Sequence, residues 1–323
     1  MIMRWPGRLA GLVAGLAVLF LVQTWVWWQG DPRSGGTDSN ALWARHQWVG
    51  QAHTDAEYRA LAALLRENRI GDVFFHAGPL EPDGSVPPGK YAYAGSLVKA
   101  LRKYAPGVRA QAYLGQLRGR LHLEDPAVRA GILRTDGAML DAGFDGIHYD
   151  IEPIFPEDTA FLGLLDQTRA VTRPRGALLS VALEQLTTLP EAQPILRRIP
   201  GDPPRPTPSY LRAVAARVDQ VAIMTYDVNL PTQSLVGRHY AWHTEQTLKL
   251  IGDQVTVFMG VPTYRPDHDW GEDLATALRG VRKGLDDLDR PPARPYGVGV
   301  YADWTTSPAE WARYRALWPT TSK

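Results

Sequence analysis

The sequence predicts a closed (β/α)₈ barrel, and three observations lead to this fold class. The chain has 323 residues, of which 45% are hydrophobic, enough for one large domain with a packed core. After the first 40 residues, short β-rich apolar runs alternate with helix-like stretches. There are eight such runs, the number that closes a barrel. An open doubly wound sheet would alternate in the same way, but no GxGxxG motif follows the first run.

Each predicted strand is a short apolar run rich in β-branched and aromatic residues. In chain order the runs are 44–50, 70–78, 108–115, 144–152, 177–184, 218–227, 255–264 and 296–304. The segments between them favour helices, over 54–68, 95–105, 126–142, 158–172, 209–217, 243–252 and 271–288. Thr54 and Asp158 are suited to cap two of these helices, and the Pro-rich stretch 189–208 is expected to be a long loop.

The N-terminus predicts a membrane segment. Residues 9–28, LAGLVAGLAVLFLVQTWVWW, form an apolar run whose only polar members are Gln23 and Thr24. A helix of about 20 such residues spans a hydrocarbon core of about 30 Å. Arg4 and Arg8 precede the run and favour a cytoplasmic N-terminus. A cleaved signal peptide is the alternative, although no small-x-small cleavage site follows the run.

These patterns divide the chain into three parts. A signal anchor or transmembrane segment covers residues 1–29, a short flexible polar linker covers 30–41, and the barrel covers 42–320. The barrel is therefore expected outside the cytoplasm, in a periplasm or at a cell surface, and held at the membrane through residues 9–28. It would be secreted if the segment were cleaved.

Composition excludes several classes of function. The chain has no cysteine, which excludes disulfides, thiolate metal sites and cysteine nucleophiles. Its 35 Lys and Arg nearly balance 34 Asp and Glu without a basic block, so nothing indicates nucleic acid as a partner. Eleven Trp and thirteen Tyr supply flat aromatic surface, most of it expected in the core or at its rim, although such surface also suits sugar rings. We expect a monomer.

In such a barrel the chemistry lies at the carboxyl ends of the strands, where GFDGIHYDIEP (143–153) carries a polar cluster. Because strand side chains alternate, His148, Asp150 and Glu152 share one face and are expected to point into the barrel. Two crowded carboxylates resist simultaneous ionisation, so the pKa of one is raised. A carboxyl group that stays protonated near neutral pH suits a general acid. The alternative is a pair of salt-bridged structural carboxylates.

The string FDGIHYDIE resembles the strand-4 motif DGxDxDxE of glycoside hydrolase family 18, the chitinase family. Asp145, Gly146, Asp150 and Glu152 match the motif, whereas His148 stands at its middle aspartate. Four further features resemble the family in order, namely its strand 5 (ALLSVAL, 177–183), its strand-6 MxYD (VAIMTYD, 221–227), its strand-7 GxPxY (MGVPTYR, 259–265) and the tryptophan after its strand 8 (Trp304). The resemblance covers roughly residues 44–310.

The resemblance implies a retaining, substrate-assisted hydrolysis, which departs from the scheme with two enzymic carboxylates. Glu152 would protonate the glycosidic oxygen and later act as the base for water. The sugar's own 2-acetamido oxygen would attack the anomeric carbon, while Asp150 holds the acetamido N–H and Tyr226 hydrogen-bonds to the acetamido group. Trp304 would stack under the sugar ring. The resemblance implies no metal or organic cofactor.

Further side chains are expected to bind substrate or line the site. His148 would form an ion pair with Asp150 if protonated and a hydrogen bond if neutral, or else be a satisfied core histidine in a degenerate site. Glu184 would bind a sugar hydroxyl or a cationic amino sugar, or pair with a loop arginine. The remaining candidates are Asp145, Asp227 and Tyr264, then His76, Gln111 and Tyr113 at the mouth, and Asp303 after the last strand.

The connection between Tyr264 and Tyr296 predicts the shape of the groove. It has only some 30 residues, and a helix is expected to fill it. Many members of the family insert a small α+β domain after strand 7, which walls the cleft. We therefore expect a shallow, open groove, which suits internal cleavage of long or branched glycans.

The leading hypothesis is an exported, membrane-anchored glycosidase of β-linked N-acetylglucosamine-containing glycans, such as chitin, peptidoglycan or N-linked glycans. A catalytically degenerate glycan-binding barrel and a hydrolase of a non-acetylated surface polysaccharide are the alternatives. The presence of Asp150, Glu152 and Tyr226 together favours an enzyme, because binding alone does not require a general acid. An anchor would favour glycans near the cell's own surface.

Overall fold

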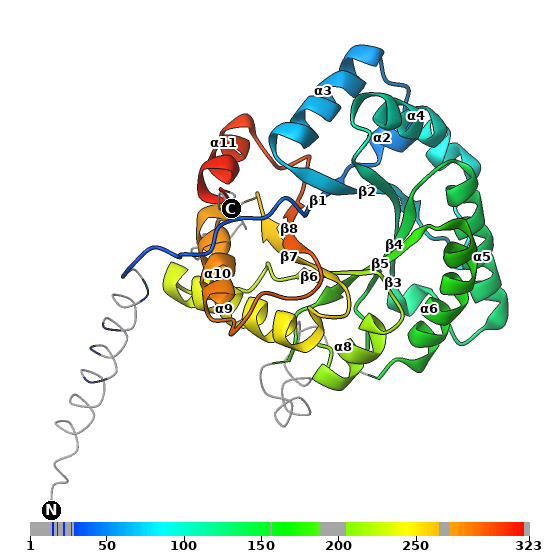
Figure 1. The fold of residues 1–323 in the computed structure, drawn as a ribbon. Coiled ribbons are helices and arrows are strands. Elements are labelled where there is room, and N and C mark those ends of the chain that lie inside the picture. Colours follow the sequence, from blue (N-terminus) through cyan, green and yellow to red (C-terminus); the bar gives the residue numbers. More distant parts are fainter. Residues whose placement is uncertain are drawn as a thin grey trace, which may run out of the picture.

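The barrel is closed, as predicted. The computed structural model describes residues 29–155, 157–187, 205–264 and 272–319, together with Gly15, Val18, Val22 and Trp27. Within them, eight parallel strands follow one another around the barrel in chain order, and helices cover its outer side (Figure 1). The strands are β1 (Asn40–Ala44), β2 (Ile70–Pro79), β3 (Arg109–Leu117), β4 (Gly146–Glu152), β5 (Leu178–Glu184), β6 (Gln220–Met224), β7 (Thr256–Pro262) and β8 (Tyr296–Tyr301).

The helices begin close to the predicted positions, and their caps explain why. Thr54 forms a capping box with Glu57, and Asp158 accepts a hydrogen bond from the amide of Phe161, which confirms both predicted caps. The α-helices are α2 (Gln47–Gly50), α3 (Asp55–Glu67), α4 (Ala94–Tyr104), α5 (Pro126–Asp141), α6 (Thr159–Thr172), α8 (Pro208–Ala215), α9 (Gln233–Ile251), α10 (Leu274–Asp286) and α11 (Pro308–Leu317). Three short 3₁₀-helices are η1 (Pro88–Tyr91), η2 (Arg118–Arg120) and η3 (Arg173–Arg175).

The first strand corrects the prediction. β1 covers Asn40–Ala44, whereas most of the run 44–50 forms the short helix α2. The strand begins with a buried polar residue, because the Asn40 side-chain oxygen accepts hydrogen bonds from the amide of Val298 and the indole of Trp318. A polar residue followed by a short apolar run gave no strand signal in the sequence. Helix α9 also begins earlier than predicted, and α11 was not predicted.

Residues 30–39 are also bound more firmly than the expected flexible linker. The carboxylate of Asp286 on α10 accepts hydrogen bonds from the amides of Arg33 (2.8 Å) and Ser34 (2.7 Å). Thr37 donates to the carbonyl of Tyr296 at 2.6 Å, at the start of β8. The segment is therefore tied to the barrel next to its closing strand. The linker prediction was wrong on this point.

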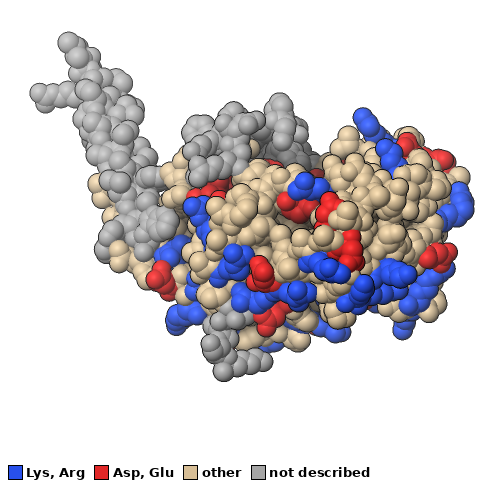
Figure 2. Space-filling model, turned by 90° about the horizontal axis from the view of Figure 1, so that it is seen from above, with Lys and Arg blue, Asp and Glu red and all other residues tan. Residues whose placement is uncertain are grey.

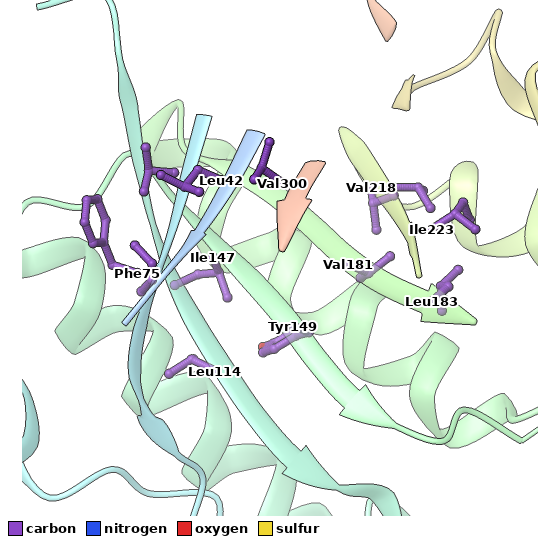
Figure 3. Close-up of a cluster of buried hydrophobic side chains, with 14 of the residues drawn as sticks. Leu42, Phe75, Leu114, Ile147, Tyr149, Val181, Leu183, Val218, Ile223 and Val300 are labelled. Atoms are coloured by element: carbon purple, nitrogen blue, oxygen red, sulfur yellow. The ribbon is translucent and has the colours of Figure 1, made fainter. Parts of the chain in front are cut away.

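The alternation of side chains along the strands builds two apolar layers. Ile147 and Tyr149 of β4 point outward, as predicted, and pack with residues such as Val181 in the layer beneath the helices (Figure 3). A second cluster fills the barrel interior. Its buried members are Ala41, Trp43, Phe74, Ala182, Ala222, Phe258 and Ala302. Polar side chains of the same inward-facing rows lie above and below this interior cluster.

Two predictions fall largely outside the described residues. Of the predicted membrane segment 9–28, only Gly15, Val18, Val22 and Trp27 are described, and of the predicted loop 189–208 only residues 205–208. Among the residues that the structure describes, none of the helices combines the length and the apolar character needed to span a bilayer. On the face shown in Figure 2, basic and acidic side chains lie among one another.

Candidate active site

Two carboxyl groups lie at the carboxyl end of β4, on its inward face. Asp150 is 6% exposed, and Glu152 is the last residue of the strand. The pKa of Glu152 is raised far above its usual value, first by burial and then by the charge of Asp150 and a hydrogen bond to it. More distant charges on Glu184 and Asp227 act in the same direction. Glu152 therefore holds its proton at neutral pH, as a general acid must.

A wall of aromatic side chains faces these carboxyl groups. Tyr226, which follows β6, stacks on Tyr301 at the end of β8, with ring centroids 4.9 Å apart. Tyr264 stands edge-on to Tyr226, at 6.4 Å. Trp304 stands edge-on to Tyr301, at 5.4 Å, and is 42% exposed. The ends of three neighbouring strands thus build one continuous wall with an exposed indole at its end.

Tyr226 is held close to the acidic pair. Its ring occupies space above Gly260 of β7, where a Cβ atom would lie 2.8 Å from ring carbon Cε1. The pKa of the Tyr226 phenol is raised, first by burial and then by the charge of Asp150, with a smaller effect of Glu152. The phenol therefore stays protonated and can donate a hydrogen bond to a group bound beside Asp150.

The rim of the site is formed by Asp227 and Tyr264. The Tyr264 hydroxyl donates to Asp227 Oδ1 at 2.6 Å. Asp227 has a left-handed backbone, with φ of 60°, which aspartate tolerates better than most residues. The carboxylate of Glu272 fixes this turn, because it accepts hydrogen bonds from the amides of Asp227 (3.1 Å) and Val228 (3.3 Å). The rim is thus set by a residue that the sequence did not point to.

A pocket of about 450 Å³ opens beside the acidic pair. Tyr113 and Tyr301 connect the two, because the pKa of each is raised first by burial and next by the charge of Asp150. The volume lies in the range of small-molecule sites, which is about 300–1,000 Å³. The pocket is lined by Arg45, His46, Gln47, His76, Tyr113, Tyr301 and Trp304.

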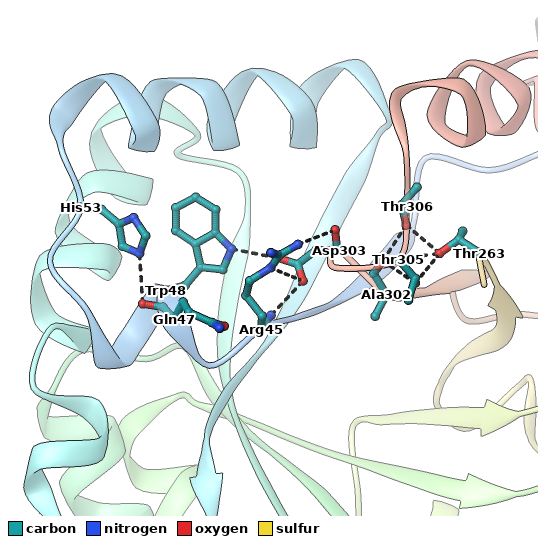
Figure 4. Close-up of polar contacts among 9 residues, drawn as sticks. All are labelled: Arg45, Gln47, Trp48, His53, Thr263, Ala302, Asp303, Thr305 and Thr306. Atoms are coloured by element: carbon teal, nitrogen blue, oxygen red, sulfur yellow. Dashed lines mark hydrogen bonds and ion pairs between the residues drawn. The ribbon is translucent and has the colours of Figure 1, made fainter. Parts of the chain in front are cut away.

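The outer wall of this pocket is fixed by Asp303 (Figure 4). Its carboxylate accepts hydrogen bonds from the amide and Nε of Arg45, at 3.0 and 3.2 Å, and from the indole of Trp48 at 2.9 Å. Its amide donates to the carbonyl of Trp43 at 3.0 Å. Asp303 was a candidate for the site, but its carboxylate joins the end of β1 to the chain after β8.

Glu184, at the end of β5, is a third carboxyl group near the pair, and it is buried. It is 7% exposed, and neither of its oxygens has a partner at good hydrogen-bond geometry among the described residues, although the backbone amides of Glu184 and Ile154 lie close enough to oppose the rise of its pKa. Burial, and to a smaller extent Asp150, raises its pKa to about 7. The charge of Arg205 acts in the opposite direction, in line with the expected loop arginine. Glu184 is therefore available to a polar group of a ligand.

No group of three or more His, Asp or Glu in the described part of the chain could hold a metal ion.

Three predicted substrate-binding residues lie elsewhere. Asp145 is at the opposite, amino end of β4, where its carboxylate accepts a hydrogen bond from the amide of Ala110 at 2.8 Å. Gln111 is fully buried and bonded to Asp72 (3.0 Å) and Gln220 (2.6 Å) inside the barrel. Both residues occupy the lower half of the barrel, because they precede the strand ends by several positions. The prediction that they contact substrate was wrong.

The third of these residues is His148. It is fully buried, stacks on Phe74 with ring centroids 3.7 Å apart, and its Nδ1 lies 2.6 Å from the Ser180 hydroxyl. Burial lowers its pKa to about 3, so the ring is neutral and, of the two alternatives, the ion pair with Asp150 does not form. It lies one layer below the mouth and does not line the pocket.

The sequence missed several residues of the site. Tyr301 belongs to the aromatic wall, and its position at the end of a predicted strand was a usable signal. His46, which lines the pocket, was missed because the first strand was misplaced. Glu272 could not have been found, because it reaches the turn after β6 only through the folding of the chain.

The comparisons with known proteins support the fold. One similar solved structure is that of the spore cortex-lytic enzyme SleL of Bacillus cereus, with 13% identity, a TM-score of 0.60, and coverage of 90% of this chain and 76% of SleL. A chitinase of Chromobacterium violaceum has 15% identity, a TM-score of 0.55 and coverage of 88% and 99%. A class V chitinase of Pseudomonas fluorescens Pf-5 has 15% identity, a TM-score of 0.57 and coverage of 86% and 99%.

Sequence comparisons add nothing to this. No protein-family model and no curated protein matches the sequence. At such low identities, the three solved structures show that this chain shares their barrel fold.

Proposed function

We propose that the chain is a glycoside hydrolase that cleaves β-linked N-acetylglucosamine-containing glycans by a retaining, substrate-assisted mechanism. The observation that carries the proposal is Glu152, a half-buried carboxyl group beside the buried Asp150, whose pKa is strongly raised. A group of this kind at the mouth of a barrel suits proton donation to a leaving glycosidic oxygen. The shared fold of chitinases and a cortex-lytic enzyme, and the resemblance of residues 143–153 to the chitinase motif, support the same reaction.

Each residue of the site has a role in this reaction. Glu152 protonates the glycosidic oxygen as the 2-acetamido oxygen of the sugar attacks the anomeric carbon. Asp150 accepts the hydrogen bond of the acetamido N–H and balances the positive charge of the oxazolinium intermediate. The phenol of Tyr226 donates a hydrogen bond to the acetamido group, and Trp304 supports the sugar ring. Water then attacks the anomeric carbon, Glu152 takes its proton, and the β-configuration is retained.

The spacing of the two carboxyl groups favours this role for Asp150 over direct attack. Side chains two positions apart on one strand lie within about 7 Å and reach the substrate from the same side. The two carboxyl groups of an ordinary retaining enzyme lie about 5 Å apart on opposite sides of the scissile bond. Asp150 is therefore suited to hold the acetamido group, and the sugar itself supplies the nucleophile.

We also propose that residues 9–28 anchor the enzyme at a membrane, with the barrel outside the cytoplasm. The apolar sequence of this segment supports the proposal, as does the exposure of Val18 and Val22. Fractionation tests it. The protein should sediment with membranes, resist alkaline extraction and dissolve in detergent, whereas release by alkali would contradict an integral anchor.

The test of the activity uses the full chain in detergent and a panel of matched N-acetylated and de-acetylated oligosaccharides. We expect cleavage of N-acetylated substrates alone, with the β-anomer as the first product seen by NMR. Glu152→Gln should lose at least 100-fold in turnover, within the range for removal of a general acid. Glu67→Gln, the same change at an exposed position of α3, is the matched control and should keep full turnover.

Each other result would point to one of the alternatives. Binding of N-acetylated oligosaccharides by the parent protein without turnover would favour a glycan-binding barrel. Equal cleavage of de-acetylated substrates would contradict assistance by the acetamido group. An α-anomer as the first product would contradict retention.

A further inference from the structure

A chain of hydrogen bonds runs through the barrel interior below the carboxyl groups, and its first member sets the direction of all the others. Asp72 on β2 accepts from the guanidinium of Arg109 at 2.5 Å. Burial raises the pKa of Asp72, but Arg109 and the two amide donors oppose this rise. Asp72 Oδ1 also faces the side-chain amides of Gln111 (3.0 Å) and Gln220 (3.1 Å). A carboxylate only accepts hydrogen bonds, so both amides turn their nitrogens toward it.

The orientation of Gln111 then determines what Ser180 does. With its nitrogen on Asp72, Gln111 presents its oxygen to the Ser180 hydroxyl at 2.9 Å. An amide oxygen can only accept a hydrogen bond, so Ser180 donates its single hydroxyl proton to Gln111. The hydroxyl oxygen can then only accept from His148 Nδ1, which lies 2.6 Å away. His148 therefore carries a proton on Nδ1.

This leaves an unused acceptor in the core. A neutral imidazole has one N–H group, so Nε2 of His148 is a bare lone pair. Nε2 has no partner in the described part of the chain, and the same holds for Asp150 Oδ1. The two residues are two positions apart on β4 and face the same way. Two buried polar atoms without partners, on one face of one strand, are the observation on which the inference rests.

We propose that His148, fixed in this tautomer, positions Asp150: its bare Nε2 can only accept a hydrogen bond, so it repels the Asp150 carboxylate, which turns toward Glu152 and the substrate. No covalent bond is made or broken. The inference rests on the proposed function, because the outward position of Asp150 is the one that holds the acetamido group. His148 is thus a positioning residue that does not touch substrate.

The other ionisable groups near Asp150 do not replace this role. The charge of Asp150 raises the pKa of five such groups. They are Tyr113 on β3, Glu152 on β4, Glu184 on β5, Tyr226 after β6 and Tyr301 on β8. Each is a phenol or a carboxyl group. None of these five carries a positive charge that would hold the Asp150 carboxylate in one place, so the direction of this carboxylate depends on what lies beneath it.

The first test reads the tautomer directly, without activity. In the full chain with ¹⁵N-labelled histidine, His148→Gln identifies one signal among the eight histidines. We expect a pyrrole-type Nδ1 and a pyridine-type Nε2 for His148, unchanged between pH 5 and 8 because burial lowers its pKa to about 3. A proton on Nε2, or an imidazolium ion in this range, would overturn the inference. This readout remains valid even if no glycan is cleaved.

The second test reads the positioning. His148→Leu keeps the bulk but removes Nε2, and should lower kcat at least tenfold with KM unchanged. His148→Gln, which can present an oxygen near the place of Nε2, should recover part of this loss. If His148→Leu does not fold, Ser180→Ala is used instead. It removes the acceptor of the His148 Nδ1 proton, so we expect a mixture of His148 tautomers and a lower kcat. Normal kcat in a folded His148→Leu, or in Ser180→Ala with mixed tautomers, would overturn the inference.

A control separates these effects from loss of packing. Thr168→Val removes a buried hydroxyl from the outer side of β4, where Thr168 lies 2.7 Å from the hydroxyl of Tyr149. It should destabilise the protein while leaving the tautomer and kcat unchanged. A Glu152→Gln variant that is inactive beside a fully active His148→Leu would overturn the positioning role and leave the proposed function standing.

Discussion

Both ends of the barrel interior carry polar side chains, but only at the amino end are these side chains hydrogen-bonded to one another. At the amino end, Asp72, Gln111, Ser180 and Gln220 form what we call the amino-end network, in which each side chain is hydrogen-bonded to another member. At the carboxyl end, Asp150, Glu152 and Glu184 form what we call the carboxyl-end cluster. Here oxygens of Asp150 and Glu184 have no partner among the described residues, and the pKa of Glu152 and of Glu184 is raised.

The difference distinguishes polar side chains that stabilise the fold from polar side chains that are available to a ligand. A buried polar atom without a partner costs about 1–3 kcal/mol, so a barrel selected for stability alone would pair or remove these carboxyl groups. The amino-end network shows that buried polar side chains inside this barrel can be hydrogen-bonded to one another. Unpaired groups at the carboxyl end are therefore best explained by a ligand that supplies the missing partners.

The largest effect is expected from replacing Asp150 in the carboxyl-end cluster. Asp150→Asn removes the charge that raises the pKa of Glu152, so the pKa of Glu152 should fall. It also removes the charge that balances the oxazolinium ion. We expect kcat to fall about 100-fold or more, the size typical for loss of one electrostatic contact to a transition state. The basic limb of the pH profile should move to lower pH, which kcat/KM between pH 5 and 10 will measure.

Asp145→Asn is the matched control for this variant. It makes the same change seven residues from Glu152 on the same segment, but at the amino end of β4. Its loss should weaken the bond to Ala110 and leave the pH profile unchanged. A profile that moved equally in both variants would show that the position of the charge in the barrel does not matter.

The second prediction uses stability to detect the unpaired Glu184. Its pKa is raised from 4.5 to about 7 in the folded state, so the folded protein keeps a proton that the unfolded chain releases. Stability should therefore fall as pH rises through this window, by at most about 3.4 kcal/mol for 2.5 pKa units at 1.36 kcal/mol per unit. Glu184→Gln should remove this loss.

Urea unfolding at pH 4.5 and pH 8 measures the effect, for the parent and for Glu184→Gln. The variant should gain stability relative to the parent at pH 8 and little at pH 4.5. An equal difference at both values of pH would mean that Glu184 is already paired in the folded protein. Glu245→Gln, at a residue that forms an ion pair with Lys249 on the surface of α9, serves as control.

The same two regions differ in how far the sequence predicted them. The alternation rule alone placed His148, Asp150 and Glu152 on the inward face of β4, and Ile147 and Tyr149 on the outward face. Periodicity therefore predicted the barrel and the carboxyl-end cluster. It did not predict depth along the barrel axis, which is why Asp145, Gln111 and His148 were expected near the substrate.

Other errors had local physical causes. β1 was misplaced because its first residue, Asn40, is a buried polar group whose partners come from the other end of the chain. Glu272 was missed because its contacts with the amides of Asp227 and Val228 depend on tertiary structure alone. Neither interaction produces a periodic pattern of residues in the sequence.

The third prediction breaks the amino-end network at Gln220. Gln220→Leu removes one donor from Asp72 and one acceptor from Gln111 and leaves both buried. The free energy of unfolding should fall by about 2–3 kcal/mol, the cost of buried groups that lose their partners. Because Ser180 keeps its bond to Gln111, kcat should stay within about threefold of the parent. A stable variant with a large loss of turnover would reverse the contrast between the two ends.

The smallest effect is expected at the rim. Tyr264→Phe removes the hydroxyl that donates to Asp227 at 2.6 Å but keeps the ring that stands against Tyr226. Because Asp227 can bind water instead, the free energy of unfolding should change by less than about 1 kcal/mol. The freed carboxylate can turn away from the site, so KM should rise a few-fold with kcat nearly unchanged. Kinetics on one N-acetylated oligosaccharide, beside urea unfolding, separate the two readouts. A larger fall in kcat than in Asp150→Asn would place the chemistry at the rim, because the carboxyl-end cluster would then contribute less than a single exposed hydrogen bond.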